Sequence, residues 1–427
     1  MKTILTFLFL GTFTISAQGF ISNDTITLTR NQAEAIFLEK NLLLLSEKLN
    51  IDKAQAQIIQ AKLWPNPTLT INEINLWSNA TSEQLPVLWG DFGKTSEIAV
   101  GLEQLIITAG KRKKMVAMEK VTAEMSVQYF EDLLRNLKVE FRNNLTELQY
   151  LQQQETIYRN QLTAIQKLIS SYKNQVTSRN LGKSEYVRLK ASELEFVQEL
   201  SQVQKEINRL QKELKIIMNL PSPNYIKISM EGFVPDIQKM ESINLGNAIE
   251  NALNKRPDIK AVKLETEYSN NRYKYERSLA VPDITLQASY DRGGNIMHNF
   301  VGFGLSFDIP FFNRNQGNIK QAKIAIEQSE IAIADKTLRI QSEIINTYSD
   351  LITVKKLYEN LDPDYEKDLD LLLESHLKNF TLRNISLLEY LDYINAYIEN
   401  KKIILSFKKD LNIHFEELQF VTAQELN

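Results

Sequence analysis

The sequence predicts a mostly α-helical protein with membrane β-strands, built from two repeated halves in which long coiled-coil helices join four strands. Three observations predict this fold class. Long stretches contain neither glycine nor proline, two glycine-rich windows alternate apolar with polar residues, and the same motifs occur twice in the same order. Each half is expected to read helix, strand, loop, strand, long helix, break and helix.

Residues 1–17 are typical of a cleavable signal peptide. One basic residue, Lys2, precedes an apolar stretch, and the small residue Ala17 follows it. This layout predicts export with cleavage after Ala17, and the alternative is a buried N-terminal helix. No later apolar run approaches the roughly 18 residues of a transmembrane helix. We therefore expect an exported chain that is soluble, secreted or a membrane β-barrel.

Five stretches lack the residues that break helices most strongly. They are 20–64, 111–181, 183–220, 318–362 and 364–427. Apolar residues in them recur every three or four positions, which predicts amphipathic helices. The 4-3-4-3 spacing of a coiled-coil seam joins Val203, Ile207, Leu210, Leu214 and Ile217. A continuous helix over 111–178 would be roughly 100 Å long at 1.5 Å per residue.

Four other segments alternate apolar and polar residues, as strands with two different faces do. They lie near 68–77, 96–105, 284–290 and 300–309, and the first loses its phase near Glu73. A tilted strand of about ten residues crosses the hydrocarbon core of a membrane. The alternative is a pair of amphipathic hairpins on a soluble core, for which the polar-faced helices leave little room.

The duplication is carried by three pairs of counterparts. They are 65–69 with 282–286, 100–102 with 303–305, and the Arg-Asn segments that begin at Arg179 and Arg383. This predicts a first repeat over 18–225 and a second over 226–427, with one hairpin in each. Membrane barrels begin at eight strands, and open edges in lipid leave backbone groups unpaired. Several copies are therefore expected to join, and closure alone does not choose between two and three.

The ordered motifs resemble the TolC-like outer-membrane factors of tripartite efflux systems. The segment 312–317, Phe-Asn-Arg-Asn-Gln-Gly, looks like the heavy-metal (Czc/Cus-type) branch, and 110–112 occupies the equivalent turn of the first half. The resemblance implies a homotrimer with a twelve-stranded β-barrel in outer-membrane lipid and a helical tunnel in the periplasm. It also implies a periplasmic adaptor (membrane fusion protein), an inner-membrane pump of the resistance-nodulation-division type, and a passive conduit with heavy-metal cations as cargo.

Two other functions remain open. In the same fold, the chain would be the outer-membrane exit duct of a type I protein secretion system, which adjoining genes would distinguish. In another class, it would be a periplasmic structural coiled-coil protein, which has no use for four alternating strands.

The resemblance also implies candidate gate residues. Glu389 and Asp392 are three apart, so they share one face of a helix. They match the positions at which the family places an acidic ring at the periplasmic aperture. Converging acids repel, favour cations and raise one another's pKa. The alternative is an ordinary solvated helix face.

The two Arg-Asn segments resemble the turns at the periplasmic tips of the coiled coils. Many relatives have glycine where this chain has Arg179 and Arg383. Glu185 and Arg188, again three apart, are the first-half counterparts of the acidic pair. We expect these four residues to make tip contacts, and an ordinary surface ion pair is the alternative for Glu185 and Arg188.

Composition excludes other functions. The net charge is only −3, which gives no reason to expect nucleic acid. The absence of cysteine excludes disulfides, thiol chemistry and a lipidated N-terminal cysteine. The histidines, His298, His376 and His414, form no metal-binding pattern, and no catalytic motif appears. No enzyme, cofactor or metal site is predicted.

Overall fold

The computed structural model describes residues 25–75, 97–177, 183–221, 223–241, 243–292 and 299–425. The predicted signal peptide, 1–17, lies outside them. Contacts divide the chain into two compact units. The first comprises 1–41, 144–233 and 371–402, and the second comprises 42–143, 234–370 and 403–427. Both units combine segments of both predicted repeats, whose boundary at 225/226 stays a prediction.

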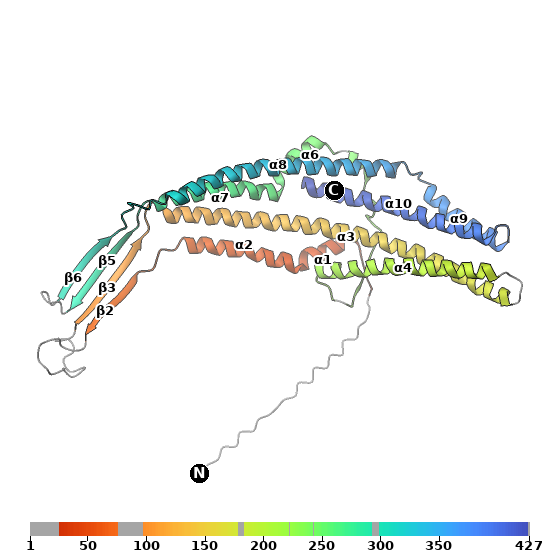
Figure 1. Ribbon diagram of the computed structural model, residues 1–427, viewed down its shortest axis with the longest axis horizontal. Helices are drawn as coiled ribbons and strands as arrows, with labels where there is room; N and C mark the ends of the chain where they lie inside the picture. Colours follow the sequence, from red (N-terminus) through yellow and green to blue (C-terminus); the bar gives the residue numbers. More distant parts are fainter. Residues whose placement is uncertain are drawn as a thin grey trace, which may run out of the picture. The chain divides into compact units, whose positions relative to one another are not determined.

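The second unit contains an antiparallel sheet of four strands (Figure 1). In order across the sheet they are β2 (Thr68–Asn75), β3 (Glu97–Ile106), β5 (Ile284–Arg292) and β6 (Asn299–Ser306). The central pair, β3 with β5, joins the two halves of the chain, from Ile98 opposite Arg292 to Ile106 opposite Ile284. Since β2 and β6 are the edges, each has one row of backbone groups with no strand partner in the described sheet.

Each strand overlaps a segment whose alternation predicts it, and the differences at the ends have local causes. The register shifts between Asn72 and Asn75 as a β-bulge, where the alternation loses its phase. β6 ends at Ser306 instead of near residue 309. The cause is that its partner β5 begins only at Ile284, so later residues of β6 have no strand to pair with. Pro282, just before β5, has no N–H with which to extend the pairing.

Each strand of the sheet adjoins a helix. α2 (Leu42–Ala61) precedes β2, α3 (Lys111–Thr177) follows β3, α7 (Pro257–Leu279) precedes β5, and α8 (Gln316–Glu359) follows β6. Figure 1 shows them in the order α2, α3, α7, α8, with α7 along α8. The 67 residues of α3 form one unbroken helix, as the lack of glycine and proline predicts.

The junctions between strands and helices are tied to one another. The N–H of Thr108, just after β3, donates to the Asp283 carboxylate at 2.7 Å, and the Lys111 ammonium lies 2.7 Å from the same carboxylate. After β6, the Asn315 side chain donates to the backbone carbonyl oxygen of Glu276 at 2.8 Å. Both turns use left-handed backbone, with φ of 67° at Gly110 and 57° at Asn315. The last turn of α7 and its connection to β5 therefore anchor the neighbouring junctions on both sides.

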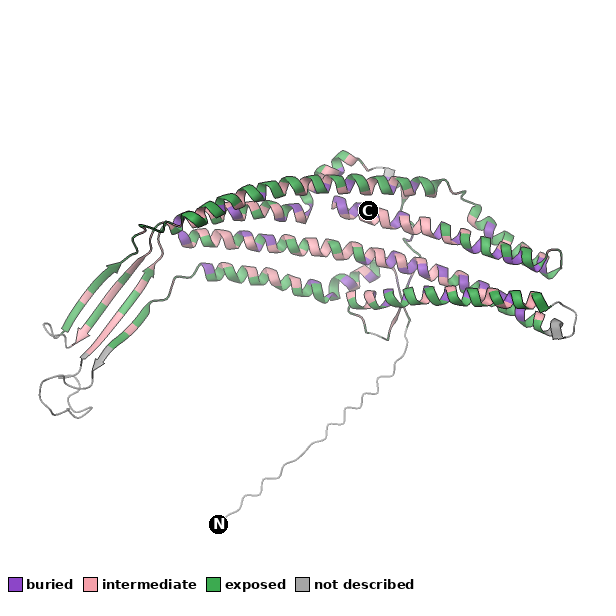
Figure 2. Ribbon diagram, viewed as in Figure 1, coloured by how far each residue is buried: buried purple, intermediate pink, exposed green. Residues whose placement is uncertain are grey.

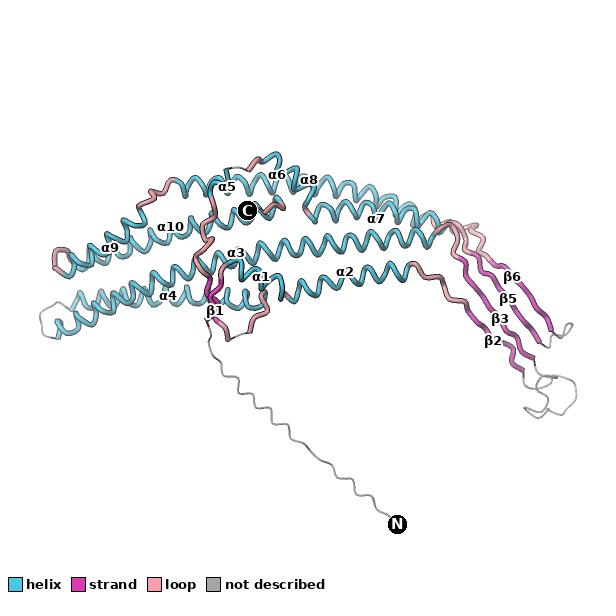
Figure 3. Tube along the Cα trace, turned by 180° about the vertical axis from the view of Figure 1, so that it is seen from behind, coloured by secondary structure: helices cyan, strands magenta, loops and turns pink. Residues whose placement is uncertain are grey.

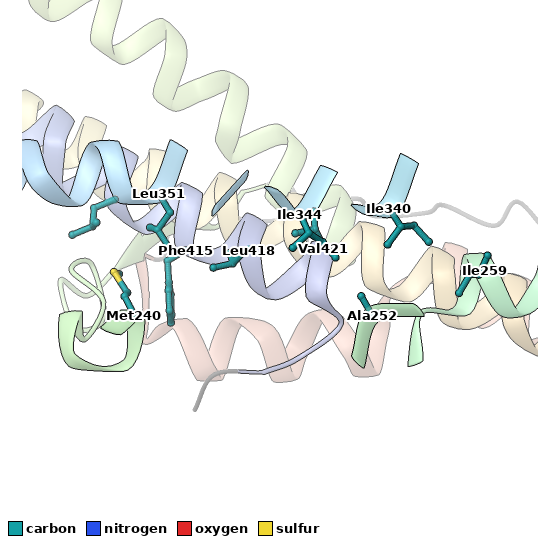
Figure 4. Packing of buried hydrophobic residues seen from close by; sticks show 10 residues of the cluster. Met240, Ala252, Ile259, Ile340, Ile344, Leu351, Phe415, Leu418 and Val421 are labelled. Atoms are coloured by element: carbon teal, nitrogen blue, oxygen red, sulfur yellow. The ribbon is translucent and has the colours of Figure 1, made fainter. Parts of the chain in front are cut away.

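A hydrophobic core lies where α8 meets the last turns of α10 (Leu387–Thr422) and the short helices α5 (Ile237–Glu241) and α6 (Leu245–Lys255) (Figure 4). Its fully buried members are Ala252, Ile259, Ile340, Ile344, Leu351, Leu411 and Leu418. Those on α8 and α10 are four or seven positions apart, which is the spacing of one helix face.

A buried charge cluster lies beside this core. The Arg256 side chain is only 3% exposed and lies 2.7 Å from the carboxylates of Asp258 and Glu343. It also donates to the backbone oxygen of Val421 at 2.9 Å, which caps the end of α10. Burial alone would raise the pKa of Asp258, but hydrogen bonds from Arg256 and Lys336 outweigh it and hold that pKa well below its usual value.

The first unit contains a feature that the sequence analysis did not predict. A parallel ribbon pairs β1 (Thr25–Leu28) with β4 (Tyr225–Ile228), two four-residue strands far apart in sequence (Figure 3). Gln211 on α4 (Lys183–Ile217) pairs with β4 as a strand would, because it donates to the Ile226 oxygen at 2.6 Å and accepts from the Ile226 N–H at 2.9 Å. α1 (Arg30–Lys40) follows β1 and begins with a capping box at Thr29 and Gln32.

Candidate functional site

The hairpin that joins α9 (Tyr365–Thr381) to α10 carries the predicted gate residues. α9 ends in a Schellman turn, in which the N–H of Asn384 donates to the Asn379 oxygen at 2.9 Å and that of Arg383 donates to the Phe380 oxygen at 3.0 Å. This turn puts Arg383 in the left-handed region, with φ of 62°. Because an arginine there costs about 1 kcal/mol, glycine is the usual residue.

Glu389 has a structural partner in this hairpin. The backbone N–H of Ser386 donates to its carboxylate at 2.7 Å and the Ser386 hydroxyl donates to it at 2.9 Å. In return, the N–H of Glu389 donates to the Ser386 hydroxyl oxygen at 3.2 Å. This is a capping box at the start of α10, and the spacing Ser-x-x-Glu was available in the sequence as its signal. Sequence analysis missed it because it weighed Glu389 only by its charge.

Asp392 lies one turn further along α10. It and Glu389 are both exposed, as an acidic face requires. The predicted mutual rise in pKa applies to acids that several assembled copies bring together. Within one chain the backbone N–H and then the hydroxyl of Ser386 hold the pKa of Glu389 below its usual value. Glu389 is therefore a fixed carboxylate at neutral pH.

A stack of aromatic rings supports this end of the first unit. Phe380 on α9 stacks on Tyr390 of α10 with ring centroids 4.8 Å apart, and on Tyr172 of α3 at 6.2 Å. Burial raises the pKa of Tyr390 to about 12. A second stack joins His376 to Tyr393 at 3.9 Å. The sequence carried no clear signal for these stacks, since ring contacts between helices depend on how the helices pack.

The structure brings two of the predicted tip residues into one neighbourhood. Burial raises the pKa of Tyr172, the charge of Glu185 raises it further, and that of Arg383 lowers it. Glu185 is half-buried and Arg188 is exposed, and among the described residues no ion pair joins these two. Arg179 lies outside the described residues.

The described acidic and histidine side chains form no metal-binding cluster. Within the described part of the chain, no group of three or more His, Asp or Glu side chains is placed to hold a metal ion. His414 lies 3.0 Å from Glu417, and this hydrogen bond raises its pKa despite partial burial. His298 lies outside the described residues.

None of the described helices combines the length and the apolar character that a membrane crossing requires.

Comparison with known proteins gives consistent results. A cobalt-zinc-cadmium resistance protein, CzcC, of Cupriavidus metallidurans is 18% identical over 296 residues, which are 69% of this chain and 66% of that protein, just under two thirds of its length. The solved CmeC outer membrane channel of Campylobacter jejuni superposes with a TM-score of 0.72 at 14% identity, over 92% of this chain and 85% of that one. A solved structure of CusC gives 0.70 at 17% identity, over 94% of both chains.

These structural likenesses show that the fold is shared. The family model of the outer membrane efflux proteins matches residues 36–218 and 248–362, which is well over half of the sequence. Its two segments include β2, β3, β5 and β6 and the helices next to them. This chain therefore belongs to the outer membrane efflux protein family.

Proposed function

We propose that this chain is the outer-membrane duct of a tripartite efflux system, working as a homotrimer with its helices in the periplasm. The observation that carries the proposal is the four-stranded sheet with two open edges. Apolar residues on its edge strand β6 are exposed, and Phe303 is 86% exposed (Figure 2). Lipid covers such a surface, but in lipid every backbone group needs a partner, so the edges must be paired by other copies. Three copies supply twelve strands.

The proposed cargo is divalent metal cations, carried passively with energy from an inner-membrane pump of the resistance-nodulation-division type through a periplasmic adaptor. Support comes from the cobalt-zinc-cadmium resistance relative and from the segment 312–317. The proposal assigns no catalytic step to this chain.

Glu389 and Asp392 are proposed to form an acidic ring at the periplasmic aperture, and Arg179, Glu185, Arg188 and Arg383 to contact the adaptor. Both acids are exposed on one face of α10, and hydrogen bonds from Ser386 lower the pKa of Glu389. Three copies of two exposed carboxylates would attract cations to the axis.

Deletion of the gene tests the cargo. Hypersensitivity to cobalt, zinc or cadmium, restored by the wild-type gene, is the expected result. A defect confined to protein secretion would contradict it and favour a type I secretion duct.

Bilayer conductance tests the ring. Glu389→Ala with Asp392→Ala should weaken cation block and cation selectivity several-fold, whereas the exposed acid Glu195 of α4, changed to Ala, should leave both unchanged. Equal block in all three proteins would remove the gate assignment.

A further inference from the structure

The junction between the sheet and its first two helices carries a cluster of basic side chains. Five basic residues, Lys62 and 111–114, lie within eight residues of β2 or β3, where α2 ends and α3 begins. Acids are distant along both helices, because the last acid of α2 is Asp52 and the first acid of α3 is Glu119. The whole chain has a net charge of −3, so this excess of positive charge is local.

One of the five charges is neutralised by a neighbouring acid. Lys111 is buried, and its ammonium lies 2.7 Å from the Asp283 carboxylate. Among the described residues, no ion pair joins any of the other four to an acid. Arg112 donates instead to the backbone oxygen of Lys62 at 2.8 Å, and the ammonium groups of Lys62 and Lys113 are on exposed side chains. Four positive charges therefore remain without an acidic partner in this part of the fold.

The basic residues are also unfavourable for the helix in which they stand. The aligned peptide dipoles make the first turn of a helix positive, so acids stabilise that turn and basic residues do not. The first turn of α3 contains no acid and begins with four basic residues. Lys114 adds only a hydrogen bond to the backbone oxygen of Ala109, at 2.7 Å. The cluster thus carries a cost in the isolated chain, which an anion from outside would offset.

Exposed aromatic rings lie at the same end of the sheet (Figure 1). Trp64 is 53% exposed, and the Arg112 guanidinium lies over its ring at 4.0 Å. Just before α8, Phe311 and Phe312 are 74% and 92% exposed, and Arg314 follows them on the surface. Aromatic rings mixed with basic side chains are typical of the boundary between lipid tails and headgroups. The junction therefore has the composition of a membrane interface.

We propose that a junction patch, formed by Lys62, Trp64, Arg112, Lys113 and Lys114, binds the headgroups of anionic phospholipids in the periplasmic leaflet of the outer membrane. The inference rests on the proposed duct, which puts the sheet in lipid and the helices in the periplasm, and it names the lipid class held where they meet. Lysine and arginine donate charge-assisted hydrogen bonds to phosphate oxygens. Clustered basic residues next to a membrane segment favour headgroups with a net negative charge over zwitterionic ones.

A lipid suits the patch better than a soluble anion or the inside of the duct. A tilted strand of about ten residues spans the hydrocarbon core, so the residues that adjoin β2 and β3 lie at the depth of the headgroups. A soluble anion would leave the Trp64 ring in water. Four basic side chains turned into a cation duct would repel its cargo, which favours their orientation toward lipid.

Native mass spectrometry of the full chain, purified in detergent and freed of lipid, tests the patch. Phosphatidylglycerol, which is anionic, and phosphatidylethanolamine, which is zwitterionic, are added separately, and the bound lipids are counted. The test variant removes three charges of the patch, in Lys62→Gln, Lys113→Gln and Lys114→Gln. A second variant keeps these charges by placing arginine at the same three positions. The matched control removes three exposed lysines of α4 and α9, in Lys205→Gln, Lys212→Gln and Lys367→Gln.

The wild type, the arginine variant and the control should bind about fivefold more phosphatidylglycerol than phosphatidylethanolamine, and salt should reduce this preference. The glutamine variant of the patch should bind both lipids equally. Equal binding by the wild type, or a preference that the glutamine variant keeps, would overturn the patch and leave the proposed duct standing.

Two further results would also overturn the patch. If inorganic phosphate removes the preference at an ionic strength at which chloride does not, the site takes a soluble anion. If an amine reagent fails to label Lys62, Lys113 and Lys114 in the lipid-free assembly, a neighbouring copy covers them. A protein that remains monomeric in detergent would instead contradict the proposed function.

Discussion

The two repeats use the same length of chain differently. In the first, α3 runs for 67 residues without interruption. In the second, the stretch from Gln316 to Thr381 is only one residue shorter but is divided into α8, of 44 residues, and α9, of 17. Between them lie Asn360 to Asp364, where Pro363 stands and the Asp362 side chain accepts the N–H of Asp364 at 3.0 Å. The first repeat has no proline within α3.

The difference shows that the two halves supply similar hairpins but differently divided helices. The sheet takes one hairpin from each half, and the pairing of β3 with β5 joins the two hairpins in one register. A helix tolerates a break if new contacts hold both parts. Here Lys408 of α10 lies 2.6 Å from Glu366 in the first turn of α9 and fixes the chain just after the break. The second repeat therefore gains a joint that the first lacks.

A proline placed in the first repeat should copy this break without its supporting contacts. Thr156 is exposed in the middle of α3. Thr156→Pro should reduce the free energy of unfolding by about 3 kcal/mol or more, because proline removes a helix hydrogen bond and its ring clashes with the preceding turn. The thermal midpoint from circular dichroism in detergent measures the loss. Thr156→Ala should keep the wild-type midpoint, and an unchanged midpoint in the proline variant would show that α3 tolerates a break.

Loss of the charge cluster should weaken the second unit. Asp258→Asn leaves the buried Arg256 with only Glu343, and we expect a loss of about 2 to 3 kcal/mol of unfolding free energy. The folded pKa of Asp258 lies below its unfolded value of about 3.9. The stabilisation is therefore complete above pH about 4 and is lost as pH falls through the folded pKa.

Melting curves at several pH values test this directly. The difference between wild type and Asp258→Asn should be constant from pH about 5 to 8 and shrink below pH about 4. A difference that grows on acidification would contradict the assigned sign.

The two hairpin ends also differ, since Ser386 of the second repeat is replaced by Gly182 in the first. Ser386→Ala should cost about 1 kcal/mol of helix stability through the lost cap. It should also return the pKa of Glu389 part of the way toward its normal value, because it removes the hydrogen bond of the Ser386 hydroxyl and keeps the larger effect of the Ser386 backbone N–H. Carbon-detected NMR titration of the Glu389 carboxyl follows the pKa, and Ser386→Thr should restore both properties. A pKa unmoved in Ser386→Ala would rule out the Ser386 hydroxyl as a cause of the lowered value.

The smallest expected change is a gain. Arg383→Gly removes the side chain from a left-handed position and should stabilise the protein by about 1 kcal/mol. Arg383→Ala keeps the strain and loses only the charge, so it separates backbone from electrostatic effects. If both variants melt at the wild-type temperature, the left-handed geometry at Arg383 carries no cost.

Much of the fold was readable from the sequence, because its signals are periodic or local. The heptad seam of α4, the unbroken length of α3, the four alternating segments and the break at Pro363 each record a local requirement of the backbone. The bulge between Asn72 and Asn75 was visible as a phase slip. The family resemblance drawn from the order of these motifs is confirmed by the family match.

What escaped prediction depends on contacts between distant segments. The ribbon of β1 with β4 joins strands of four residues, too short to show alternation, and Gln211 completes it with a side-chain amide. The cluster around Arg256 and Asp258 and the stack of Phe380 on Tyr390 likewise exist only after helices pack. At the candidate gate, a local signal existed and was missed, because Glu389 was weighed as a charge and not as a cap.

The mass of the detergent-solubilised protein, measured by native mass spectrometry, tests the central claim most directly. A sheet that one chain leaves open on both sides predicts particles of several chains and none of one chain alone at working concentration, and the proposed duct predicts three chains. Mature protein that stays dissolved as a single chain after the detergent is removed would contradict it.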